Sequence, residues 1–89
     1  MRELHNKDEL NEIKNAERGY ILNQRTNVNR LHRVTCDYVA VMWINPHPKF
    51  FFAEFEEAEQ WADARYGKSP TGWVKCNICH PSGPVKWPD

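Results

Sequence analysis

The sequence has few cysteines and no long apolar segment, and both absences restrict what the protein can be. Three cysteines in 89 residues cannot all pair in internal disulfides, and a reducing compartment keeps such thiols available for a metal. No apolar run approaches the length of a transmembrane helix, and the opening stretch MRELHNKDELNEIKNAERG lacks the apolar segment of a secretory signal. We therefore expect a cytoplasmic protein with no membrane partner.

An excess of charge of either sign is also missing, because the formal net charge is zero. This balance argues against one large surface for polyanions. The charges are nevertheless sorted along the chain. Residues 18–49 contain five basic residues and one acid, whereas residues 51–66 contain five acids and one base. Sorting of this kind predicts a dipolar surface.

The chain shows no internal repeat and no motif of the common enzyme classes. It lacks the Gly-x-Ser-x-Gly motif, a phosphate-binding loop and a pair of carboxylates in a pocket-forming context. With 40% hydrophobic residues and a mean hydropathy of −0.80, a chain of this size buries a small core and needs additional stabilisation. We expect one small domain that is not an enzyme and that is stabilised by a metal or a partner.

The N-terminal half predicts one helix followed by a strand. Leu10 and Ile13 follow helical spacing within residues 6–17, and Gly19 is expected to end that helix. The segment GYILNQ is short and apolar enough for a strand, and the Asn-rich RTNVNR after it is typical of a turn. Together these two segments indicate a hairpin or an exposed loop.

The C-terminal half predicts a strand pair and then the main helix. Tyr38 to Ile44 (YVAVMWI) is expected to be a central strand, with KFFFA after the prolines as its antiparallel partner. Apolar residues at helical spacing predict a helix over about residues 54–66, ended by Gly67. The predicted class is α+β, with a small antiparallel sheet. We divide the chain into an N-terminal helix (1–18), a zinc-binding domain (19–82) with a zinc knuckle at its end, and a tail (83–89).

Two short motifs place four metal-binding side chains in pairs. His32 and Cys36 form His-x3-Cys in LHRVTC, and Cys76 and Cys79 form Cys-x2-Cys in KCNICHP. Tetrahedral zinc is bound by such chelating pairs, and the long insert lets two parts of a fold meet at the ion. We predict a structural Zn²⁺ held by these four residues, since four protein ligands leave no position for a catalytic water.

Other interpretations of the cysteine and histidine motifs remain. Cys76-x-x-Cys79-His80 matches the attachment motif of c-type haem, but haem attachment normally requires export and would leave His32 and Cys36 unexplained. A redox dithiol lacks the surrounding βαβ pattern, and three buried thiols without a metal fit poorly with neighbouring Pro, Gly and Lys. His80 is an alternative to His32 as the nitrogen ligand.

The order of strand, ligand pair, sheet, helix and final C-x-x-C-x-P resembles the Ada-type metal-binding domain of bacterial DNA alkylation-repair proteins. It is more similar still to small bacterial and phage modules with the same zinc site, found alone or beside HNH endonucleases, in which a His often fills the first ligand position as in LHRVTC. The resemblance covers roughly residues 19–82 and implies a zinc scaffold and DNA as partner. Repair members use a cysteine at the first position as methyl acceptor, so His32 argues against methyl transfer.

Two binding functions follow as hypotheses. The favoured partner is DNA, contacted by basic and amide side chains that suit phosphates and base edges, with Tyr20 and Trp43 as stacking surfaces. The alternative is a protein partner, because four tryptophans are more than a small core hides and Trp73 or Trp87 would then be an exposed anchor; Trp73 covering the metal knuckle is the other possibility for that residue. The predicted nucleic-acid-binding residues are Arg18, Arg25, Asn27, Arg30 and Arg33.

Overall fold

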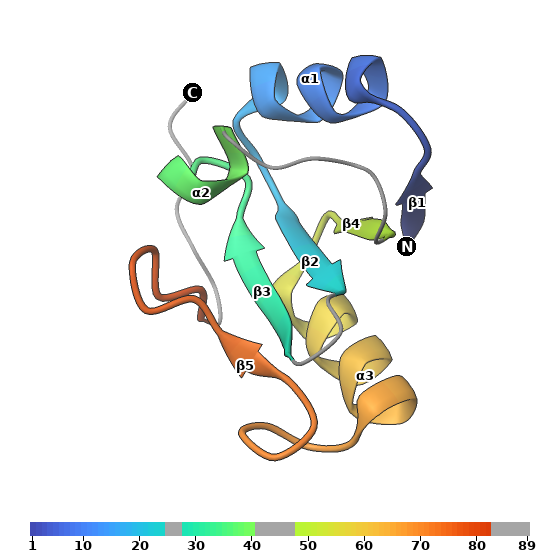
Figure 1. Ribbon diagram of the computed structural model, residues 1–89, viewed down its shortest axis with the longest axis vertical. Coiled ribbons are helices and arrows are strands. Elements are labelled where there is room, and N and C mark those ends of the chain that lie inside the picture. Colours follow the sequence, from blue (N-terminus) through green and yellow to red (C-terminus); the bar gives the residue numbers. More distant parts are fainter. Residues whose placement is uncertain (25–27, 41–47, 83–89) are drawn as a thin grey trace.

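The computed structural model describes residues 1–24, 28–40 and 48–82. These residues form an α+β domain with one mixed five-stranded sheet in the order β1-β4-β2-β3-β5 (Figure 1), and this confirms the predicted class. Every neighbouring pair is antiparallel except β3 and β5, which are parallel. The elements are β1 (Arg2–Leu4), α1 (Lys7–Ala16), β2 (Tyr20–Gln24), β3 (Asn29–Arg33), α2 (Asp37–Ala40), β4 (Lys49–Phe52), α3 (Phe55–Tyr66) and β5 (Val74–Lys75).

Of the two alternatives, a hairpin or an exposed loop, the structure shows the hairpin: β2 pairs with β3, a strand that was not predicted and that begins inside the predicted turn RTNVNR. The register of this hairpin decides which side chains face which core. Leu22 pairs with Leu31, while their neighbours Ile21 and His32 pair with each other. Because successive side chains of a strand point to opposite faces, the two leucines join the cluster under α3, and Ile21 joins a second cluster under α1 and α2. The sheet is therefore covered on both faces, and His32 lies on the face opposite α3.

Both main helices have identifiable starts and ends. Asn6 caps α1, since its Oδ1 accepts a hydrogen bond from the amide of Glu9 at 2.9 Å. Glu17 in the left-handed conformation ends this helix, two residues before the predicted Gly19. At α3 the helix ends as predicted, with Gly67 at φ 94°. The first turn of α3 is acidic, as the helix dipole favours.

The predicted strand Tyr38 to Ile44 is wrong at its beginning, because α2 occupies Asp37–Ala40; the rest of that segment lies outside the described residues. The amide of Val39 donates to the carbonyl of Cys36 at 3.0 Å, and the Val39 side chain is completely buried in the second core. This packing overrides the local preference for a strand. The strand β4 is confirmed, but its partners are β1 and β2.

Two short edge strands escaped prediction, and they join the chain's ends to the sheet. The strand β1 pairs with β4, and Leu4 lies in the second core together with Leu10 and Ile13 of α1. The predicted N-terminal unit thus shares a core with the rest of the domain. At the other edge, β5 pairs with β3 in parallel, so the predicted all-antiparallel sheet is instead mixed. Strands of two or three residues carry too short a pattern to be recognised in a sequence.

Candidate metal centre

The first predicted pair of ligands lies at the end of β3. His32 is the second-last residue of that strand, and its side chain is only 3% exposed. The chain then turns, with the amide of Cys36 donating to the carbonyl of Arg33 at 3.0 Å. This tight turn brings the Cys36 thiol back beneath the sheet, where it is buried.

The second pair follows β5, and the parallel pairing brings it to the same place. The amide of Cys76 donates to the carbonyl of Leu31 at 2.9 Å, which fixes Cys76 beside the β3 residue that precedes His32. The chain next makes a turn closed by the amide of His80, which donates to the Cys76 carbonyl at 3.0 Å. His80 adopts a positive φ of 46° there. This turn returns Cys79 toward Cys76.

One donor atom from each of the four residues lies within 4.8 Å of the others, so His32, Cys36, Cys76 and Cys79 could hold a metal ion. The Sγ atoms of Cys36 and Cys76 are 3.8 Å apart. Two sulfurs on a tetrahedral zinc, each about 2.3 Å from the ion, lie about 3.8 Å from each other. The spacing is thus that of shared coordination and far exceeds a disulfide's S–S length of about 2.05 Å.

Backbone amides point at each of the three sulfurs. The amide of Ile78 donates to Cys76 Sγ at 3.3 Å, and the amide of Arg33 donates to Cys79 Sγ at 3.2 Å. The amide of Tyr38 similarly donates to Cys36. Such donors stabilise the thiolate, which is the metal-binding form of cysteine.

The imidazole is held in its metal-binding form as well. Burial lowers the pKa of His32 to about 4, and the nearby Arg30 guanidinium contributes in the same direction. Its ring is therefore neutral at pH 7. Among the described residues its buried Nδ1 has no hydrogen-bond partner. A buried polar atom normally has a hydrogen-bond partner, so a bound metal would supply the partner that this nitrogen lacks.

The thiols differ in how readily they lose a proton. Burial raises the pKa of Cys36 and raises that of Cys79 to about 12. Burial acts the same way on Cys76, but hydrogen bonds from the amides of Cys79 and Ile78 and from the side chains of Cys36 and Cys79 together outweigh it and lower the pKa of Cys76. Two of the three thiols would thus be driven to ionise mainly by a bound cation.

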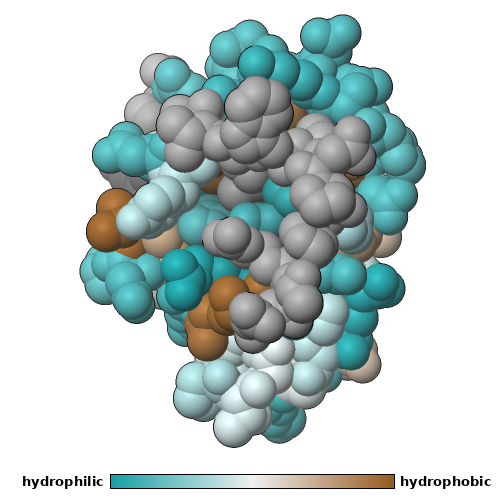
Figure 2. All heavy atoms as spheres, in the orientation of Figure 1, coloured by the Kyte–Doolittle hydropathy of each residue, from teal (hydrophilic) through white to brown (hydrophobic). Residues whose placement is uncertain are grey.

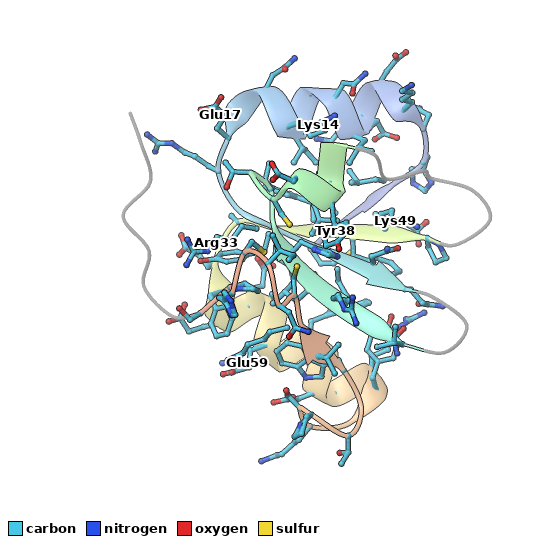
Figure 3. All side chains as sticks on the ribbon, turned by 60° about the vertical axis from the view of Figure 1, so that its left-hand side comes forward. Lys14, Glu17, Arg33, Tyr38, Lys49 and Glu59 are labelled. Carbon is cyan, nitrogen blue, oxygen red and sulfur yellow. The ribbon has the colours of Figure 1, made fainter. Side chains whose placement is uncertain are left out.

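The alternative ligand His80 lies outside the donor group, which contains His32 instead. Its side chain is exposed, and the residue's left-handed backbone serves the turn. Sequence spacing does not separate the two histidines, whereas the fold does so because β3 and β5 are neighbours. Figure 3 shows the yellow sulfur atoms between the labelled Arg33 and Tyr38.

Two of the predicted nucleic-acid-binding residues, Arg30 and Arg33, do not share one face of the sheet. Arg30 and Arg33 are three positions apart on β3, so their side chains start from opposite faces of the sheet. Arg18 is exposed just before β2. Arg25 and Asn27 lie outside the described residues. None of the ion pairs found among the described residues involves Arg30 or Arg33, and the buried Nε of each has no partner there.

The predicted aromatic surfaces are corrected where the structure describes them. Tyr20 is 2% exposed and packs against Phe55, so it offers no stacking surface. Trp73 is buried in the core under α3, where its Nε1 donates to Asp63 at 2.7 Å; it is neither an exposed anchor nor a cover for the metal ligands. Trp43 and Trp87 lie outside the described residues. Tyr38 and Ile78, by contrast, are exposed. In the sequence each of them follows a cysteine of the donor group by two residues.

Comparison with known proteins gives no relative from which a function could be transferred. No protein-family model matches the chain, and no curated protein or solved structure matches it significantly. Within the described segments, none of the helices has the length and apolar character needed to cross a bilayer.

Proposed function

We propose that the protein is a small binding module stabilised by a structural Zn²⁺ and that its partner is a nucleic acid. The observation that carries the metal assignment is the convergence of three sulfurs and one imidazole within 4.8 Å. Soft thiolate ligands with an imidazole favour zinc among the abundant divalent ions. Magnesium and calcium prefer oxygen ligands, which this donor set lacks.

The proposed role of the ion is structural. Four protein donors complete a tetrahedral shell and leave no open position for a substrate or a reactive water, so we expect no catalytic activity from this centre. The ion would join the turn after β3 to the turn after β5, because these two turns carry the donors that come together beside neighbouring strands. Because the thiols must stay reduced to bind it, a reducing compartment such as the cytoplasm suits the site.

The nucleic-acid partner is supported by the arginines of β3. Arg30 and Arg33 have no carboxylate partner among the described residues, and a guanidinium in this state is available to a phosphate. The resemblance to Ada-type modules points the same way. The observation behind the protein-partner alternative is weaker, because Trp73 is buried.

Replacing either arginine with glutamine tests this partner. We expect Arg30→Gln and Arg33→Gln each to weaken DNA binding and to reduce the slope of log affinity against log salt by about 1, because one phosphate contact is lost. Fluorescence anisotropy with a labelled oligonucleotide at several salt concentrations measures both. Lys68→Gln, in the exposed loop after α3, is the control for charge alone. If the unmodified protein binds no oligonucleotide even at low salt, the nucleic-acid assignment is wrong.

Zinc uptake is expected to release about two to three protons near pH 7.5, because all three cysteines bind as thiolates and an ordinary thiol pKa of about 8.5 keeps most of them protonated in the metal-free chain. His32 should release almost none, since the ordinary pKa of an imidazole, about 6.5, lies below this pH. Calorimetric titration of the metal-free, reduced protein in buffers of different ionisation enthalpy counts the protons. In the variant His32→Cys the count should rise by about one. A release well below two protons would show that the thiols are not the ligands.

A further inference from the structure

Two large apolar side chains are exposed on the loops that carry the metal ligands. Tyr38 is 51% exposed and Ile78 is 58% exposed. Apart from Met1 at the chain's start, they are the only exposed large hydrophobic residues in the part of the chain that the structure describes. The described surface in Figure 2 is mostly hydrophilic, with small separate hydrophobic areas. A pair of such residues at one site points to a contact surface.

Both residues occupy the same position relative to the metal centre. Each follows a ligand cysteine by two residues, and each donates its amide to that cysteine's sulfur. The two sulfurs, of Cys36 and Cys76, are 3.8 Å apart. The backbones of Tyr38 and Ile78 therefore flank one centre, and the hydrogen bonds that position them depend on the same thiolates.

Arg33 completes this surface with a cation. Its amide donates to the third sulfur, of Cys79, and its guanidinium donates to the His80 carbonyl at 3.4 Å. Although the Arg33 side chain starts from the α3 side of the sheet, its guanidinium thus reaches the turn after β5, which exposes Ile78. On the other side of the centre, the ring of Tyr38 lies edge-on to the ring of His32, with 6.2 Å between the ring centroids. We call Tyr38, Ile78 and Arg33 the rim of the metal centre.

Two arginines, Arg33 of the rim and Arg30 beside it, have no carboxylate partner among the described residues. Arg30 lies close enough to His32 to lower its pKa, and Arg33 reaches the turn after β5. Lys75 is turned to the α3 side, with its Nζ 5.2 Å from the centroid of the Phe55 ring. Guanidinium groups in this position suit a phosphate.

We propose that the rim binds single-stranded nucleic acid, with one base stacked on Tyr38, its edge against Ile78 and a neighbouring phosphate on Arg33. This inference rests on the proposed function and specifies the form of nucleic acid. In a duplex the faces of the bases are already stacked on one another, so an exposed ring can stack only on bases of a single strand.

The test compares Tyr38→Ala with Tyr38→Phe in the zinc-loaded full chain. The probes are a fluorescein-labelled oligodeoxythymidine, its duplex with oligodeoxyadenosine, and the matching oligouridine. We expect Tyr38→Ala to weaken single-strand binding about 5- to 150-fold, because stacking on one base contributes that much, and Tyr38→Phe to retain it. Since Tyr38 is half exposed, zinc content and thermal midpoint should be unchanged in both variants. Comparing the DNA and RNA single strands shows which of the two the rim prefers.

Three results would overturn the inference. If Tyr38→Ala binds single strands as tightly as the unmodified protein, the rim contacts another class of partner, such as a protein. If the duplex binds more tightly than either single strand, stacking on Tyr38 is not the mode of binding. In both cases salt-dependent binding through Arg30 could persist, so the proposed function would survive. If none of the three probes binds at low salt, both proposals fail.

Discussion

Replacing Cys76 with serine is expected to abolish zinc binding and cooperative folding together. Cys76 is 1% exposed and its sulfur lies 3.8 Å from that of Cys36, so the substitution removes one of the four proposed ligands from the buried metal centre. Binding of a structural zinc contributes on the order of 10 kcal/mol or more to small domains. The net stability of a whole domain is only about 5–15 kcal/mol. The variant should therefore be largely unfolded at room temperature.

The measurement is zinc per chain by elemental analysis, combined with thermal unfolding followed by circular dichroism. The matched control is His80→Asn, which changes a potential ligand beside Cys79 but outside the donor group. Asparagine tolerates the left-handed backbone found at this position. This control should keep one zinc and its melting transition. A Cys76→Ser protein that retained both would show that the four donors do not share an ion.

Trp73→Ala is expected to cause the second large effect, a loss of about 3–5 kcal/mol in the free energy of unfolding. Trp73 is 1% exposed in the core under α3, and removing a buried aromatic side chain leaves a cavity as well as lost apolar contacts. In a domain of this size such a loss lowers the thermal midpoint by about 12 °C or more. Thermal unfolding of the zinc-loaded protein measures it.

Trp73→Phe separates the ring from its hydrogen bond. Phenylalanine keeps most of the apolar volume but loses the donor to Asp63. Because Asp63 is partly exposed and regains water, we expect this variant to lose only about 1–2 kcal/mol. Equal losses in the two variants would mean that the hydrogen bond, and not the packing of the ring, accounts for the contribution of Trp73.

The group of four donors that could hold a metal ion is the feature that the sequence predicted best. Two chelating pairs were predicted from spacing alone, because ligands two or three residues apart reach a common ion through local backbone geometry. Both main helices were also predictable, since their apolar spacing and ends are local properties. In α1, for example, Asn6 caps the helix while Leu10 and Ile13 face the core.

The sequence by itself therefore determined the donor set and the two main helices, which depend on residues close together in the chain, and it left a hairpin or an exposed loop open after Gly19. Only the tertiary structure decided that His32 and not His80 joins the cysteines, because that choice depends on β3 lying beside β5. It also placed Arg30 and Arg33 on opposite faces and turned the residues after Cys36 into a helix. Each of these outcomes depends on packing between distant segments, which no local pattern encodes.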